Sequence, residues 1–231
     1  MRKLIFGILF IAACSPGKKQ TATGDTIFIY REKTKDHYYK VYIDPNKQSA
    51  DRQHLLDFQF DKEEQKEITE DYVNIKREFC TPLKKYDLSN LPSEWLPLVL
   101  HKGKYYIYYP SDYGCTGRTT ITDTMMIYRG FEIFQNPLLL TNKINIHKYQ
   151  LKIAGRYPNE KDKQLTIYII DDKKKVAVWE DMSQPMASRY GLYVAREGAA
   201  SFDMVVNRCE QNKVMEYQFD KVDYAGLIKG K

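Results

Sequence analysis

Two pairs of adjacent carboxylates are the residues best suited to acid–base chemistry. Asp171-Asp172 precede three lysines, and Glu180-Asp181 follow Trp179. Two carboxyl groups suffice for glycoside cleavage when a fold holds them about 5–10 Å apart. Both pairs stand among polar residues typical of solvated turns, whereas a general acid needs an apolar environment that raises its pKa. We therefore predict no catalytic residue and keep a glycan or cell-wall hydrolase that uses a carboxylate pair as the alternative hypothesis.

Other motifs of catalysis and cofactor binding are absent from the sequence. It contains no Gly-x-Ser-x-Gly nucleophile motif, no Walker phosphate loop and no Gly-x-Gly-x-x-Gly fingerprint. The four histidines are isolated, and no cysteine pair has the close spacing that zinc sites use. We expect no metal and no cofactor, and we favour a non-catalytic binding or structural module over an enzyme. A site assembled from distant strands stays open.

Tyrosines form the most suggestive surface. Tyr106 and Tyr108 fall on one face of a predicted strand, Tyr105 and Tyr109 fall on the other, and Tyr113 follows. If one face packs inward, the other can offer rings to a cavity, a partner or water, and tyrosine suits recognition because it joins an apolar ring to a polar tip. Tyr106, Tyr108 and Tyr113 are the candidate binding surface. The competing interpretation is a sheet stabilised by cross-strand aromatic pairs, about 0.2–1 kcal/mol each.

The elements that would position these groups alternate with a period of two. Apolar residues recur at every second position in four segments: Tyr39, Val41 and Ile43; Leu56, Phe58 and Phe60; Tyr149, Leu151 and Ile153; and Leu165, Ile167 and Ile169. Such alternation is typical of half-buried strands, and the abundance of tyrosine and β-branched residues suits a pleated surface. The best helical candidate, residues 62–70, is nearly all charged and equally compatible with an exposed turn.

Short turns separate these strands. We expect hairpin connections at residues 101–104, 171–175 and 196–198. Roughly a dozen short strands joined in this way predict an all-β fold, an antiparallel β-sandwich or β-barrel with little helix. If a barrel closes, its interior could hold a small apolar ligand, as in lipocalin-like folds.

Charge excludes one class of partner. The net charge of the 231-residue chain is only +6, and basic residues alternate with acids throughout. Nucleic-acid-binding proteins concentrate basic residues on one face, so we expect no nucleic acid. The long irregular stretch at residues 80–95 could divide a small N-terminal β unit from a larger C-terminal one, or it could be a crossover within a single domain.

The N-terminus has the pattern of an export signal. Arg2 and Lys3 precede an apolar stretch at residues 4–13, and small residues stand directly before Cys14. Ten apolar residues are about half of the ~20 that a membrane-spanning helix needs, whereas the arrangement fits a signal peptide. The ending Ile-Ala-Ala-Cys resembles the lipobox of bacterial lipoproteins. This resemblance implies cleavage before Cys14 and a diacylglyceryl group on its sulfur, with acyl chains such as palmitate.

The resemblance divides the chain into a signal peptide at 1–13, an acylated cysteine with a flexible tether at 14–25, and an antiparallel β domain at 26–231. Ser15, not aspartate, follows Cys14, and by resemblance this favours the outer membrane of the cell envelope. The implied partner is the membrane, through the lipid on Cys14. An envelope protein or a small ligand is the further partner that we expect.

Three other cysteines remain if Cys14 carries lipid. At most one disulfide can then form among Cys80, Cys115 and Cys209, and export to an oxidising compartment favours it. Cys80 and Cys115 both flank predicted loops, so this pair is the candidate disulfide, and the other pairings stay open.

Overall fold

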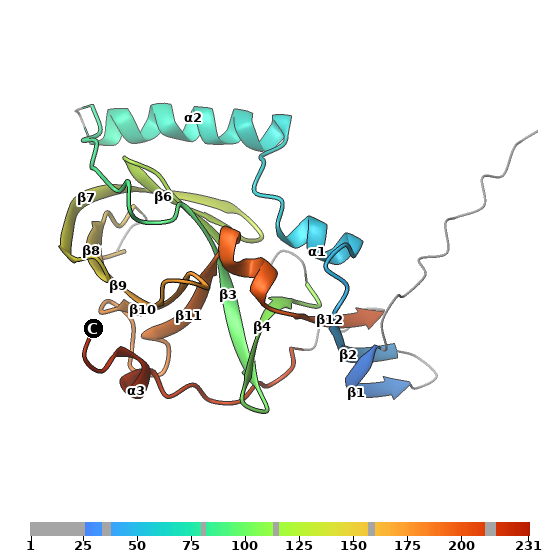
Figure 1. Ribbon diagram of the computed structural model, residues 1–231. Coiled ribbons are helices and arrows are strands. Elements are labelled where there is room, and N and C mark those ends of the chain that lie inside the picture. The colour runs from blue at the N-terminus through green and yellow to red at the C-terminus, as the bar shows by residue number, and fades with distance from the viewer. Residues whose placement is uncertain (1–25, 34–37, 80–81, 113–115, 157–159, 211–215) are drawn as a thin grey trace, which may run out of the picture.

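Eight antiparallel strands close into a barrel (Figure 1). The structure, a computed structural model, describes residues 26–33, 38–79, 82–112, 116–156, 160–210 and 216–231. Strands β5 to β11 follow one another as a meander, and β3 closes the ring by pairing with both β5 and β11. The barrel strands are β3 (Glu94–His101), β5 (Arg118–Ile121), β6 (Met125–Arg129), β7 (Ile133–Asn145), β8 (Lys148–Ile153), β9 (Lys163–Asp171), β10 (Val176–Asp181) and β11 (Tyr190–Ala195). The all-β prediction is confirmed, in its barrel form.

Four further strands extend the sheet beyond β3. From β3 outward they are β4 (Lys104–Tyr109), β12 (Met204–Glu210), β2 (Tyr38–Asp44) and β1 (Ile27–Lys33). Strand β3 serves both parts because its first residues pair with β5 and its last residues pair with β4. Figure 1 shows β1 and β2 on the side of the molecule away from β7 and β8. The predicted division near residues 80–95 stays a prediction, although one sheet continues across both sides of it.

Two of the predicted hairpins are confirmed. Residues 101–104 join β3 to β4, and residues 171–175 join β9 to β10. In the first turn Lys102 has φ 49° and Gly103 has φ 73°. Two successive positive φ angles match the right-handed twist of the flanking strands, and glycine adopts them without strain.

The third predicted hairpin, at residues 196–198, is wrong. The chain forms the 3-10 helix η2 (Arg196–Ser201) there, and β12 then pairs with β2 and β4 instead of β11. Gly198 lies so close to the β9–β10 turn that a Cβ on it would come within 2.0 Å of the Lys174 carbonyl oxygen. This close packing carries the chain over the barrel end and away from β11.

The prediction of a strand at residues 54–60 is also wrong. Its start belongs to α1 (Ala50–Leu55), whose N-cap Ser49 accepts a hydrogen bond from the Arg52 backbone N–H. The rest belongs to no helix or strand. Phe58 is nevertheless buried. Alternation here reflects a connecting segment packed on the barrel, which the sequence pattern cannot distinguish from a paired strand.

The charged segment 62–70 begins the longest helix of the described chain, α2 (Lys62–Glu78). Asp61 accepts hydrogen bonds from the backbone N–H groups of Glu63 and Glu64, and the Glu64 side chain accepts from the Asp61 N–H. This capping box satisfies donors that a helix start otherwise leaves unpaired. Only Ile75 of α2 is fully buried, so the helix carries almost no apolar period, and the sequence expectation missed its length.

Two apolar clusters line the two faces of the barrel wall. Inside, Trp95, Leu151, Ile167 and Trp179 belong to one buried cluster. The stretch that leads into β3 closes one end of this interior. There Tyr86 packs against the cluster, and its backbone N–H donates to the carbonyl of Asp123 in the β5–β6 turn, with an N–O distance of 2.8 Å.

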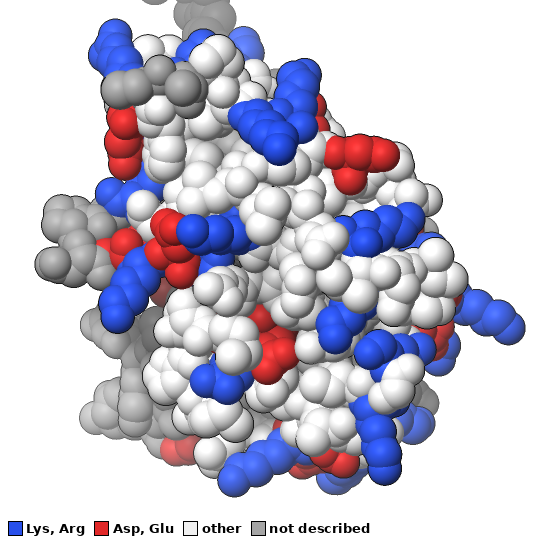
Figure 2. Space-filling model, turned by 90° about the vertical axis from the view of Figure 1, so that its left-hand side faces the viewer, with Lys and Arg blue, Asp and Glu red and all other residues white. Residues whose placement is uncertain are grey.

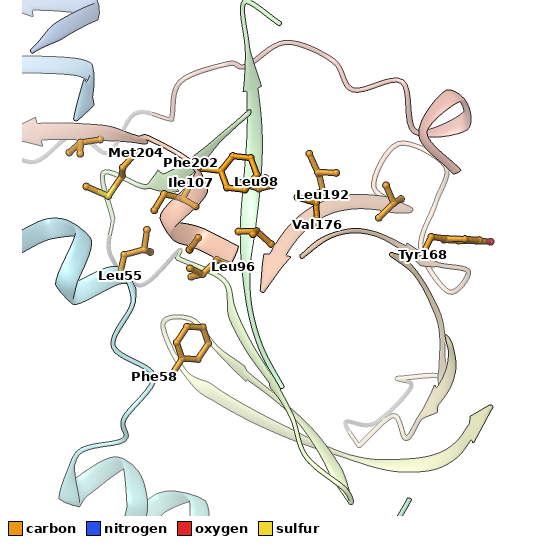
Figure 3. Close-up of a cluster of buried hydrophobic side chains, with 14 residues drawn as sticks. Leu55, Phe58, Leu96, Leu98, Ile107, Tyr168, Val176, Leu192, Phe202 and Met204 are labelled. Carbon is orange, nitrogen blue, oxygen red and sulfur yellow. The ribbon is translucent and has the colours of Figure 1, made fainter. Parts of the chain in front are cut away.

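The second cluster lies outside the barrel, where α1, β4 and β12 cover β3, β10 and β11 (Figure 3). Its labelled members are Leu55, Phe58, Leu96, Leu98, Ile107, Tyr168, Val176, Leu192, Phe202 and Met204. Each fully buried aliphatic or aromatic side chain stabilises the fold by about 1.5–3 kcal/mol. The wall is therefore held from both sides, which leaves a rigid frame around the open end of the barrel.

Candidate ligand-binding cavity

The open end of the barrel interior is hollow. One hollow of about 180 Å³ and another of about 300 Å³ share Met126, Tyr128, Ile153, Lys163 and Asp181 among their lining residues. Every strand from β5 to β11 contributes to the lining. An eight-stranded barrel is just wide enough to be filled by side chains or to hold one small ligand. Here side chains fill the closed end and leave the other end free.

Aromatic rings form one wall of this cavity. Trp179 on β10 and Tyr193 on β11 stack with ring centroids 4.2 Å apart and an interplanar angle of 25°. Trp95 meets Trp179 edge-on, at 5.5 Å and 68°. Tyr193 also fills the space beside Gly191, where an added Cβ would lie 2.6 Å from its Cε2 atom. The wall is thus a rigid aromatic surface, fixed before any ligand arrives.

Tyr193 is partly buried and borders the cavity. Burial, with smaller contributions from Tyr128, Tyr224 and Asp181, raises the pKa of Tyr193 to about 12. Its hydroxyl is therefore neutral at physiological pH. It offers the cavity a hydrogen-bonding group without a charge.

Two hydrogen-bond donors at the cavity have no acceptor. The indole Nε1 of Trp179 and the guanidinium Nε of Arg189 are both buried without a hydrogen-bond partner among the described residues. Trp179 is only 4% exposed. A buried donor left unpaired costs about 1–3 kcal/mol, so native proteins retain few of them. An acceptor on a bound molecule would remove this cost.

The acids at the cavity, in contrast, already have partners. Glu160 lies 3.0 Å from the Lys163 ammonium. Asp181 accepts hydrogen bonds from the Ser183 hydroxyl at 2.6 Å and the Ser183 N–H at 2.9 Å. The lining therefore combines an apolar aromatic body with unpaired donors, which is the composition of a small-molecule site.

Comparison with family models, curated proteins and solved structures finds no match to this chain.

The tyrosines that the sequence singled out lie elsewhere. Tyr106 is 7% exposed and belongs to a buried cluster on β4, so the prediction that its ring is offered to a partner is corrected. Tyr108 is half-buried; its ring meets Phe219 at 4.9 Å, and its hydroxyl donates to Glu216. Tyr113 lies outside the described residues. Both faces of β4 are packed, because one face joins the cluster that contains Leu55 of α1 and the other contacts Tyr217 and Phe219 of the C-terminal segment.

The two carboxylate pairs are not brought together. Asp171 accepts the N–H groups of its own turn, and Asp172 lies 3.0 Å from His147. Glu180 points to the outer wall, where it accepts hydrogen bonds from two tyrosine hydroxyls, while Asp181 points to the cavity. Neighbours on a strand face opposite ways, so adjacent acids cannot act as a pair.

The cysteine predictions fall mainly outside the described residues. Cys14, Cys80 and Cys115 are all outside them, so acylation and the disulfide stay predictions. Cys209 is described and lies half-buried on β12, beside the cluster that contains Tyr106. Within the described ranges, no group of three His, Cys, Asp or Glu side chains is placed to hold a metal ion. In the same ranges, no helix has the length and apolar character to span a membrane.

The surface charge agrees with the sequence pattern. Figure 2 shows lysine and arginine side chains scattered singly over the face near β7 and β8, with acidic and uncharged residues between them. On this visible face the basic residues do not form a continuous stripe of the kind that tracks a nucleic-acid backbone.

The cavity residues were missed at the sequence level for an identifiable reason. Leu165 and Ile153 were recognised as inward-facing, but their alternation does not show where the interior is filled and where it is hollow. Trp179 and Gly191 carried a local signal, since a large ring at the end of one strand and a glycine in the next favour close aromatic packing. Arg189 carried none.

Proposed function

We propose that this chain is a non-catalytic, lipid-anchored protein of the bacterial cell envelope whose barrel binds one small ligand. The cavity at the open end of the barrel carries the proposal. It combines an aromatic wall with unpaired hydrogen-bond donors, and the barrel strands hold the wall in place. Anchoring rests on the lipobox-like ending at Cys14, and Ser15 after it favours the outer membrane.

Blocking the cavity tests ligand binding. The full chain carrying Cys14→Ala is purified without detergent, which could itself enter an apolar cavity, and is titrated with the fluorescent probe N-phenyl-1-naphthylamine. We expect the probe to bind, and we expect Met126→Trp to abolish binding, because Met126 lines both hollows. Native mass spectrometry of the same preparation identifies any ligand that co-purifies.

Met186→Trp is the matched control. Met186 is 67% exposed and does not line the cavity, so this change adds the same ring in solvent. Probe binding that survives Met126→Trp unchanged would contradict the proposal.

A glycan hydrolase is the second candidate, since Glu160 and Asp181 both line the larger hollow. The polar partners of both carboxylates favour the binding function, because a general acid needs a desolvated carboxyl group. Release of reducing sugars from cell-wall glycan by the natural chain, and its loss in Asp181→Asn, would replace the binding proposal with this one.

A further inference from the structure

The two unpaired groups at the cavity are both donors. Trp179 Nε1 and Arg189 Nε lack partners among the described residues, and both side chains line the smaller hollow. Arg189 lies in the β10–β11 connection, and Trp179 lies on β10. The smaller hollow therefore offers a ligand one charged donor and one neutral donor.

The acids of the same lining already have partners. Glu160 is paired with Lys163, and Asp181 holds its own turn through Ser183. Arg189, in contrast, is a charged residue of the lining whose Nε has no hydrogen-bond partner among the described residues. A guanidinium binds a carboxylate or a similar planar anion better than any neutral acceptor, because its N–H groups form charge-assisted, often paired, hydrogen bonds.

The shape of the wall restricts the rest of the ligand. Trp179 and Tyr193 present stacked rings, and Gly191 lets Tyr193 lie flat against its own strand. Planar rings pack against such a surface with little loss of conformational freedom. Ligand sites usually occupy about 300–1,000 Å³; the larger hollow, about 300 Å³, is at the lower end of this range, and the smaller one, about 180 Å³, is below it. These volumes favour a molecule of one or two fused rings over a long acyl chain.

We infer that the ligand is a small aromatic anion, whose acidic group is bound by Arg189 and Trp179 Nε1 and whose ring lies against Tyr193. This inference rests on the proposed function and names the chemical class that the same cavity takes. The acidic group then contacts the two donors that lack a partner, and the ring lies beside Tyr193 in the same hollow.

A pair of probes with the same ring system tests the inference. The sulfonate 1-anilinonaphthalene-8-sulfonate and the uncharged N-phenyl-1-naphthylamine differ in the anionic group alone. Both are titrated against the full chain carrying Cys14→Ala, and each is used to displace the other. We expect the sulfonate to bind more tightly, by about tenfold, which corresponds to about 1.4 kcal/mol.

Two variants remove the donors one at a time. Arg189→Gln and Trp179→Phe should each weaken sulfonate binding by about tenfold, since one charge-assisted or one buried hydrogen bond is lost. Each variant should weaken binding of the sulfonate more than binding of the uncharged probe, so that the preference for the sulfonate falls. Arg208→Gln is the control, because Arg208 lies on β12, outside the barrel, and pairs there with Asp51 of α1. Thermal unfolding of each variant shows that it is folded.

The outcomes separate the two proposals. Equal affinity for both probes in the natural barrel, or an Arg189→Gln change that weakens both equally, would overturn the aromatic-anion inference and leave ligand binding intact. Failure of both probes to bind would overturn the proposed function as well. A sulfonate preference that Arg189→Gln and Trp179→Phe each remove would support the inference.

Discussion

Gly191 decides the shape of the aromatic wall. An added Cβ would lie 2.6 Å from the Cε2 atom of Tyr193, closer than side chains tolerate. The ring cannot easily retreat, because Trp179 stacks on it at 4.2 Å. Gly191→Ala should therefore push Tyr193 into the cavity. We expect a loss of about 1–3 kcal/mol in the free energy of unfolding, as for other overpacked interiors, together with weaker probe binding.

A second substitution shows whether contact with the Tyr193 ring causes the loss of stability in Gly191→Ala. In Gly191→Ala combined with Tyr193→Leu, the smaller side chain should relieve the contact, so the two effects on stability should fall short of their sum. Urea unfolding of the two single variants and the double variant gives this coupling. Strict additivity would mean that Gly191→Ala acts through the backbone and not through Tyr193.

At the scale of elements, α2 is held to the barrel by two arginines, Arg129 at the end of β6 and Arg156 in the β8–β9 connection. Arg129 bonds both carboxylate oxygens of Glu64, at 2.8 and 2.6 Å. Arg156 bonds both oxygens of Asp71, at 2.7 and 2.8 Å, and also the carbonyl of Gln135. Bidentate, partly buried pairs of this kind are stronger than ordinary surface ion pairs. The helix, with one fully buried side chain of its own, depends on them.

Removal of one pair measures that dependence. Arg156→Gln leaves Asp71 and the Gln135 carbonyl without their charged donor, so we expect urea unfolding to show a loss of about 1.5–3 kcal/mol. Lys66→Gln is the control on the same helix, because the Lys66–Glu70 pair is exposed and 3.8 Å long, and its loss should cost at most about 0.5 kcal/mol. Equal losses of stability in Arg156→Gln and Lys66→Gln would contradict the conclusion that the Arg156–Asp71 pair holds α2 to the barrel.

The elements differ in how far the sequence predicts them. Strands β8 and β9 were predictable, since Leu151, Leu165 and their neighbours alternate and one face is buried. The α2 capping box at Asp61 and Glu64 was readable as a local signal, but the helix lies on the surface and shows no apolar period. Closure of the barrel by β3 and β5, through the Trp95–Thr119 pairing, is a non-local contact that no local pattern encodes.

At the scale of the whole molecule, the cavity and the start of the chain lie in different parts of the fold. The first described strand, β1, is the outer edge of the sheet extension, whereas the cavity lies inside the barrel (Figure 1). Three strands of the sheet order, β2, β12 and β4, separate β1 from the barrel ring. An anchor at the N-terminus can therefore hold the protein at a membrane without occupying the binding site.

This separation leads to a prediction about Cys14. In a bacterial host, the natural chain should incorporate a labelled fatty acid and fractionate with membranes, whereas Cys14→Ala should be unlabelled and released. The reason is that several acyl chains together anchor a protein stably in a membrane, and a protein without them is not anchored. Probe affinity should be the same in both forms, since the anchor precedes β1. Cys209→Ala is the control for label attached to another thiol. Equal labelling of the natural chain and Cys14→Ala would exclude a lipid on Cys14. Membrane attachment would then need another cause, whereas ligand binding in the cavity would be unaffected.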